Sequence, residues 1–262
     1  KHITADQQLQ RRIMEEMGTV LISSPSSSDS HPLTLAHSSL SPNFSVPILL
    51  QVNSIGMPKF PLVCAAGIHR TIRQKYCLAR LRNPVRHNLY VDDRRQRKII
   101  IAYHLRCGDS CFSTYRTTSF DSIANTCWKL NELFQQIDPS RRLSFHFFSQ
   151  SPPNNTAEDH FAPLMQQLYP LETHGHWHTK STSVMHHLIM SDILIGAVSG
   201  FSWLAFLLHN RVVLGLFPSC TDQIHYDKLT GEFNQQQFIN AWSKYKDQLP
   251  KFESFQDCLN IQ

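Results

Sequence analysis

Residues 98–217 alternate between short runs of β-branched or aromatic side chains and longer amphipathic stretches. Four runs have the composition of buried strands: 98–104 (KIIIAYH), 143–149 (LSFHFFS), 192–197 (DILIGA) and 211–217 (RVVLGLF). Buried strands that alternate with helices are typical of a parallel sheet covered on both faces. We therefore predict an α/β fold with a Rossmann-like parallel sheet that contains these four segments.

Between these runs, apolar residues recur at the spacing of a helix face. They predict helices over 120–134, 156–168, 183–190 and 201–209, and one more near 238–245. Thr156 is expected to cap the second of these helices, with Asp159 at its third position. The C-terminal half, 98–262, is therefore predicted to be a single α/β domain.

Residues 1–97 differ in character, and we predict a reduced, loop-rich N-terminal region there. The segment 23–42 is crowded with Ser and Pro, which indicates an exposed loop or a wrapping arm. Around it, the pattern predicts a helix over 9–17, short strands at 45–50 and 60–65, and a basic helix over 68–79.

The bulk composition limits the classes of protein to consider. A hydrophobic fraction of 41% supports a packed core, and no apolar run reaches the roughly 18 residues of a transmembrane segment. A net charge of +5 suits an anionic substrate, an acidic partner or RNA, although a solvated basic face explains it as well. The chain holds no Walker loop, no dinucleotide-binding glycine motif and no RNA-binding fingerprint, so it carries no direct nucleic-acid signature.

The spacing of cysteines and histidines does not predict a metal site. None of the seven cysteines forms a C-x-x-C pair. His174, His176 and His178 have the H-x-H-x-H spacing that can bind zinc from one face of a strand, but no carboxylate stands at a matching spacing. We therefore expect a loop over the edge of the active site at this segment, and no metal.

The first predicted strand runs directly into a charged turn, HLRCGD at 104–109. Open α/β sheets bind their ligands at the carboxyl ends of the strands. Arg106 is therefore placed to contact a diphosphate and to stabilise charge on a leaving group. Gly108 would allow the backbone to approach closely, and Asp109 could orient Arg106 or accept from a sugar hydroxyl. The simpler alternative is an ion pair between Arg106 and Asp109 in an ordinary turn.

A second strand enters a turn of small residues that opens a helix, in the sequence SDILIGAVSGFSW at 191–203. The hydroxyls of Ser199 and Ser202, with the free amides near Gly200 and Phe201, could cradle a pyrophosphate at the start of the helix. Ser199 could instead serve only as the cap of that helix.

Together these two elements resemble the superfamily of α1,2-, α1,6- and protein O-fucosyltransferases. Its members carry H-x-R-x-G-D or a near variant, followed by D-x-x-(I/L)-x-x-x-S-S-F-S-W. The matching residues are His104, Arg106, Gly108 and Asp109, then Asp192, Ser199, Phe201, Ser202 and Trp203. The stretch 145–215 looks particularly like glycosyltransferase-like proteins of algae and protists, and the resemblance covers nearly half of the chain.

The resemblance implies a nucleotide-binding domain of the GT-B type, with GDP-fucose as donor, inversion at the sugar carbon and no cofactor. Arg106 and Asp109 would be catalytic. The donor would be bound by His104, Arg106, Gly108, Asp192, Ser199, Gly200, Phe201 and Ser202. The acceptor would be a glycan or protein hydroxyl in the Golgi or secretory lumen. Asp109, Glu172 and His174 are the candidates for a general base.

Three departures from the superfamily pattern favour a second hypothesis. Cys107 stands where many members have Arg, and Gly200 replaces the second Ser of the turn. The 97 residues before Lys98 hold no Gly-rich phosphate loop, although a complete first domain is expected there. The alternative is a non-catalytic, glycosyltransferase-derived structural subunit of a larger assembly in an organelle-resident complex. An enzyme requires an open cleft beside Arg106, whereas a structural subunit requires that cleft to be filled.

Overall fold

The computed structural model describes residues 73, 75–79, 88–107, 117–150, 156–177, 179–209, 212–215 and 223–246. All of them belong to one compact unit, Pro61–Gln262. The predictions made for residues 1–65 lie outside the described residues. The basic helix predicted over 68–79 is described at Arg73 and 75–79, which are helical.

Six parallel strands form the central sheet, in the order β3-β2-β1-β4-β5-β6. The strands are β1 (Ile99–His104), β2 (Leu143–Phe148), β3 (Thr173–His176), β4 (Ile193–Ile195), β5 (Val212–Gly215) and β6 (Gln223–His225). This order is that of a doubly wound Rossmann-type sheet, in which the direction of winding reverses between β1 and β4. The predicted α/β class and the parallel arrangement of the four predicted strands are confirmed.

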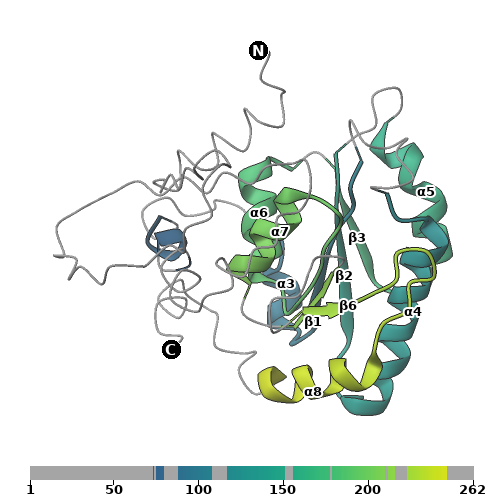
Figure 1. Cartoon of the computed structure of the whole chain (residues 1–262). Helices are drawn as coiled ribbons and strands as arrows, with labels where there is room; N and C mark the ends of the chain where they lie inside the picture. The colour runs from purple at the N-terminus through teal and green to yellow at the C-terminus, as the bar shows by residue number, and fades with distance from the viewer. Residues whose placement is uncertain are drawn as a thin grey trace, which may run out of the picture. The chain divides into compact units, whose positions relative to one another are not determined.

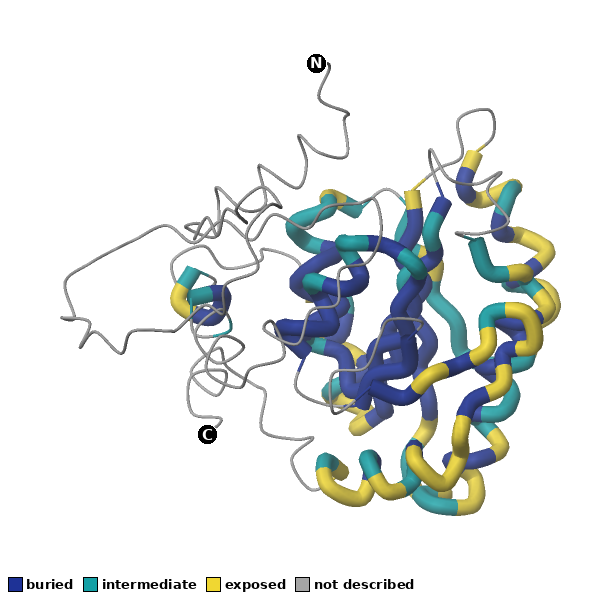
Figure 2. Tube along the Cα trace, in the orientation of Figure 1, coloured by how far each residue is buried: buried dark blue, intermediate teal, exposed yellow. Residues whose placement is uncertain are grey.

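Helices cover both faces of the sheet (Figure 1). One layer contains α4 (Phe120–Ile137), α5 (Ala157–Gln167) and α8 (Gln235–Tyr245), and the other contains α3 (Val91–Arg95), α6 (Ser181–Met190) and α7 (Gly200–Leu208). The five helices predicted within residues 120–245 are all present, with ends shifted by a few residues. Apart from the half-buried edge strand β3, the strands are buried along most of their length, whereas the outer sides of α4, α5 and α8 are exposed (Figure 2).

The main core lies between the sheet and the α4, α5 and α8 layer. Ile99, Ile101 and Tyr103 alternate along β1 toward this side, because successive strand residues point to opposite faces. Phe134 of α4 packs edge-on against Trp242 of α8, with ring centroids 4.8 Å apart. This contact joins the C-terminal helix to the domain and accounts for the apolar spacing seen near the end of the sequence.

Polar side chains set the starting points of four helices. In each case the capping oxygen accepts a hydrogen bond from the amide three residues later, which satisfies one of the free donors at a helix start. These pairs are Ser119 with Ser122, Thr156 with Asp159, Ser199 with Ser202, and Asn234 with Gln237. Thr156 therefore caps α5 with Asp159 at the third position, as predicted.

Among the elements of the described residues, sequence patterns missed three: α3, β3 and β6. The segment 174–178, for which a loop was expected, contributes β3 instead, and β3 pairs in parallel with β2. That expectation was wrong because the half-buried edge strand carries two histidines and a glycine, with Thr173 as its one β-branched residue. Helix α3 precedes the domain boundary predicted at Lys98 yet lies against β1. The boundary itself stays a prediction.

Candidate functional site

The two sequence elements that carry the resemblance meet at the carboxyl edge of the sheet. His104 ends β1, and the turn that contains Ser199 leads from β4 into α7. The Nδ1 atom of His104 lies 2.5 Å from the hydroxyl oxygen of Ser202. This contact bridges β1 and β4 at the point where the winding of the sheet reverses, which is where doubly wound folds bind their ligands.

The hydrogen bonds around Ser202 define the tautomer of His104. The Ser202 hydroxyl oxygen accepts from the amide of Ala197 at 3.0 Å, and its own proton is then available for Nδ1 of His104. Burial of the ring and the positive charge of Arg106 lower the pKa of His104 to about 3. A neutral imidazole that accepts at Nδ1 carries its proton on Nε2. Within the described residues, His104 makes no second hydrogen bond, so Nε2–H remains available as a donor.

The start of α7 presents further donors close to His104. Ser199 caps the helix by accepting from the amide of Ser202 at 3.0 Å, which was the simpler of its two predicted roles. Gly200 and Phe201 are the first two residues of the helix, and the Phe201 ring lies 5.2 Å from the ring of His104. Amides at the first positions of a helix have no partner within the helix. The capped turn therefore keeps two backbone donors at its start.

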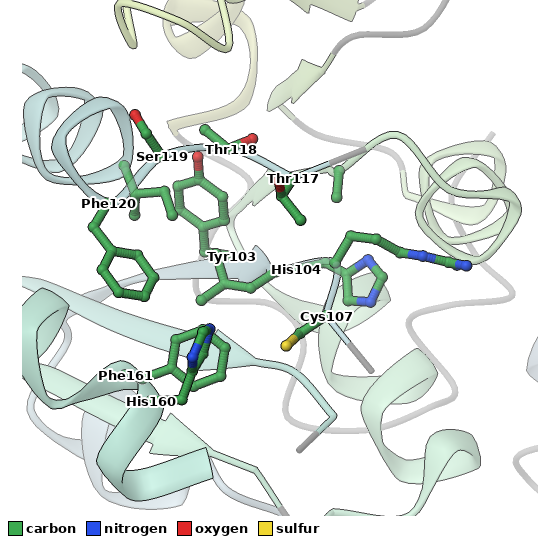
Figure 3. Close-up of a pocket in the computed structure, with 13 residues that line it drawn as sticks. Tyr103, His104, Cys107, Thr117, Thr118, Ser119, Phe120, His160 and Phe161 are labelled. Atoms are coloured by element: carbon green, nitrogen blue, oxygen red, sulfur yellow. The ribbon is translucent and has the colours of Figure 1, made fainter. Parts of the chain in front are cut away.

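A pocket of about 240 Å³ opens beside the end of β1 (Figure 3). Its lining comes from the segment after β1, the start of α4, one turn of α5 and the end of β4: Tyr103–Cys107, Thr117–Phe120, Ile123, His160, Phe161 and Ala197. Arg106, which is half-buried, therefore lies on a pocket wall together with His104. Gly108 and Asp109 lie outside the described residues.

Two walls of the pocket were not predicted from the sequence. One is polar and carries the hydroxyl groups of Thr117, Thr118 and Ser119 ahead of α4 (Figure 3). The other is aromatic: the ring centroids of Phe120 and Phe161 are 5.9 Å apart, and His160 packs edge-on against Phe120 at 5.6 Å. Such a pairing of hydroxyl groups and aromatic faces is typical of small-molecule sites. In the sequence, the only feature that pointed to these two walls was the predicted start of α4 and of α5.

The structure does not bring Asp192 to this edge. Asp192 precedes β4, so it lies at the amino end of that strand, and its side chain is 1% exposed. Both carboxylate oxygens accept from Nη1 of Arg94, at 2.8 and 2.7 Å, and Oδ2 also accepts from the amide of Ile100 at 2.9 Å. These contacts anchor α3 to the sheet. The position of Asp192 therefore does not support the donor-binding role that was expected for it.

Two of the proposed general bases also lie away from the pocket. Glu172 precedes β3 and contacts the ammonium group of Lys98, and His174 lies within β3. Neither lines the pocket, whereas His160 does. Cys107 is disulfide-bonded, as is Cys77, so Cys107 carries no thiol.

No protein-family model matches the chain, and the curated proteins contain no significant match to it. The resemblance to fucosyltransferases therefore depends on the two motifs and on their positions in the fold. Among the residues that the structure describes, no helix is long and apolar enough to span a bilayer.

Proposed function

We propose that this domain binds a nucleotide sugar and transfers fucose from GDP-fucose to a hydroxyl group of a glycan or protein, with inversion. The observation that carries the proposal is the hydrogen bond between His104 and Ser202. It joins the two motifs where a doubly wound sheet binds ligands, and it borders a pocket that also contains Arg106. On this proposal the described sheet is the donor-binding half of a GT-B enzyme.

The charge in the pocket suits a diphosphate. Arg106 supplies a permanent positive charge with donors in a fork that fits phosphate oxygens. His104 adds a neutral N–H donor on the same wall. The amides of Gly200 and Phe201 begin α7 beside His104, although neither residue lines the pocket itself. When the bond between the sugar and the diphosphate breaks, negative charge grows on the departing diphosphate, and these donors stabilise it.

His160 is the side chain in this pocket that can remove the proton of the acceptor. It extends from α5 on the wall across from His104 (Figure 3). In an inverting transfer, a base takes the proton of the acceptor hydroxyl while its oxygen bonds to the sugar carbon and the diphosphate leaves with the bonding electrons. His160 replaces Glu172 and His174 as the proposed base because it lines the pocket and they do not.

The disulfide-bonded cysteines support the proposed compartment. Cys77 and Cys107 are both in disulfides, and such bonds persist in oxidising compartments such as the secretory pathway. The Golgi or secretory lumen, where GDP-sugars are used as donors, is therefore the proposed location of the enzyme.

One observation favours the alternative of a non-catalytic structural subunit in an organelle-resident complex. The pocket volume of about 240 Å³ lies below the roughly 300–1,000 Å³ that is typical of sites for drug-sized ligands. A retained fold with a reduced pocket is what loss of catalysis would leave.

Calorimetric titration of the purified chain with GDP and with GDP-fucose separates the two functions. We expect saturable binding of both by the wild-type chain, and a loss of affinity of at least about tenfold in Arg106→Ala, which corresponds to about 1.4 kcal/mol. The matched control is Arg95→Ala, because Arg95 is exposed on α3 and forms only a surface pair with Asp92. No measurable affinity of the folded wild-type chain for either ligand would decide for the structural subunit.

A further inference from the structure

A second cluster of polar side chains lies beneath α3, on the face of the sheet opposite the main core. Asp93, His146 and His174 each offer one ligand atom, and these atoms all lie within 4.8 Å of one another. They come from three elements: α3, β2 and β3. The histidine spacing seen in the sequence lacked a carboxylate at matching distance along the chain, and the fold supplies that carboxylate from Asp93.

Strand register places the two histidines together. His146 and His174 are direct partners in the pairing of β2 with β3, and their rings stack with centroids 4.7 Å apart. His176 lies two residues farther along β3 on the same face, and its Nε2 atom is 2.9 Å from Nδ1 of His146. The other ring nitrogen of His146, Nε2, lies 2.8 Å from Oδ2 of Asp93. Nε2 of His146 therefore faces the carboxylate, and Nδ1 faces His176.

The carboxylate of Asp93 is held in place from its other side. Its Oδ1 accepts from the ammonium group of Lys98 at 3.1 Å, and Oδ2 accepts from the hydroxyl of Ser144 at 3.1 Å. Lys98 also contacts Glu172, so two carboxylates and one ammonium group leave a net charge of −1 beside the histidines. This excess negative charge favours an added cation.

One nitrogen in this cluster is buried without a hydrogen-bond partner among the described residues. Nε2 of His174 is inaccessible to solvent and has no hydrogen-bond partner among the described residues, although it lies 3.4 Å from Oε1 of Glu172. A buried polar atom that lacks a partner carries a desolvation cost, which a ligand can remove. The His174 side chain as a whole is 41% exposed, which provides an entry path from the edge of the sheet.

The geometry points to a zinc site formed by Asp93, His146 and His174. Two imidazoles and a carboxylate are the borderline ligand set that zinc prefers over magnesium or calcium. Bonds of about 2.0–2.2 Å in tetrahedral geometry place ligand atoms about 3.4 Å apart. Side-chain rotation must therefore separate Nε2 of His146 slightly from Oδ2 of Asp93, now 2.8 Å away, to admit the ion between them. When Nε2 of His146 binds the ion, the ring proton resides on Nδ1 and is donated to His176. Lys98 holds the free oxygen of the carboxylate in the same way.

Titration of the metal-stripped full chain with ZnCl2 tests this site. We expect one saturable site per chain by calorimetry and a melting temperature that rises with ZnCl2 but not with MgCl2, because a ligand that binds only the folded state stabilises it. His174→Ala is the main variant, since this partly exposed side chain can be removed with the least damage to the fold. It should weaken zinc binding at least about tenfold, and His176→Ala should weaken it by about 10–100-fold.

The matched control is His225→Ala, which removes an exposed histidine on β6, on the opposite edge of the sheet. Circular dichroism establishes that each variant folds. Absence of a saturable zinc site in the folded wild-type chain, or equal zinc affinity in wild type and His174→Ala, overturns the proposal. The outcome does not depend on the nucleotide site, because none of the three ligands lines that pocket.

Discussion

His104 and Ser202 are 98 positions apart in the sequence, yet their side chains hydrogen-bond at 2.5 Å. One residue ends β1 and the other belongs to the first turn of α7. The bond therefore couples the two segments that form the candidate nucleotide site, and loss of either side chain affects both.

Ser202→Ala should destabilise the fold and weaken donor binding together. The substitution leaves the buried amide of Ala197 and Nδ1 of His104 without a partner, at a cost of about 1–3 kcal/mol. Urea unfolding and GDP titration provide the two measurements. Ser243→Ala is the control, because Ser243 is exposed on α8 and bonds only to its own helix. Unchanged stability in Ser202→Ala would show that the bond does not form in solution.

Asp192→Asn should reduce stability without changing donor affinity. Asp192 is the buried partner of Arg94, and removal of one charge from a buried pair costs about 3–5 kcal/mol. Because Arg94 is 27% exposed, we expect a loss of about 3 kcal/mol, the lower end of this range. Asp92→Asn, an exposed change on the same helix, should have little effect on unfolding. A large loss of GDP affinity in the folded Asp192→Asn chain would return Asp192 to the donor site.

His160→Gln should slow transfer while GDP affinity is preserved. If His160 removes the acceptor proton, its loss should reduce kcat by about 10²–10⁴-fold. His225→Gln is a control of the same chemistry far from the pocket in the fold. An unchanged kcat in His160→Gln would exclude this role and leave Asp109 as the remaining base among those considered.

Stability should fall as the pH is lowered below neutrality. Burial lowers the pKa of His187 to about 4, although the hydrogen bond with the Ser183 carbonyl opposes this shift, and the pKa of His104 is about 3. Histidine in an unfolded chain has a pKa of about 6.5. Between this pH and the lower pKa values of the folded state, the unfolded chain therefore binds more protons than the folded chain. The stabilisation is complete above about pH 6.5 and is lost as the pH approaches 4. For His187 alone it is on the order of 3 kcal/mol.

Urea unfolding at several pH values from 7 to 5 measures this dependence. His187→Gln should be less stable at pH 7 and should show a shallower decline with acidification. The imidazole accepts from the amide of Leu89 at 3.0 Å, a bond that protonation of His187 removes. Equal slopes for wild type and His187→Gln would contradict the assignment.

Gly231→Ala should be more damaging than Gly175→Ala. Gly231 has a φ of +73°, and an added Cβ would lie 2.1 Å from the backbone oxygen of Ser122 in α4. Strained backbone and overpacking together predict a loss of more than about 2 kcal/mol in the free energy of unfolding. At Gly175 the three atoms nearest to the added Cβ belong to the ring of Trp177, a side chain that can shift more readily than the backbone of α4. Similar losses at the two positions, measured by urea unfolding, would contradict the predicted order.

The sequence predicted elements whose patterns are local. The β-branched run Ile99–Ile101 and the cap Thr156 each depend on neighbours within a few positions, and both were predicted correctly. The capping role of Ser199 was the alternative to its predicted part in donor binding. Strand β3 was missed because it is stabilised by pairing with β2 rather than by its own composition. Helix α3 has no apolar stripe and depends on the ion pair between Arg94 and Asp192.

The candidate site was predicted only in part for a related reason. His104, Arg106 and the turn at Ser199 could be placed because each follows a recognisable strand. The wall that contains His160 could not, because only the folded chain shows which turn of α5 faces the end of β1. Asp192 belongs to the same motif as Ser202 but lies at the other end of β4, and a linear motif does not reveal that separation.

The strand order also constrains how the chain can fold during synthesis. β1 can pair with β2 once residue 148 has been made, but its second partner, β4, begins only at Ile193. Until then Ile101 and Tyr103 lie on an open, apolar strand edge, which is a template for pairing with another chain. A nascent chain that stalls before β4 is therefore at risk of aggregation, and fragments that end before Ile193 should precipitate when expressed alone.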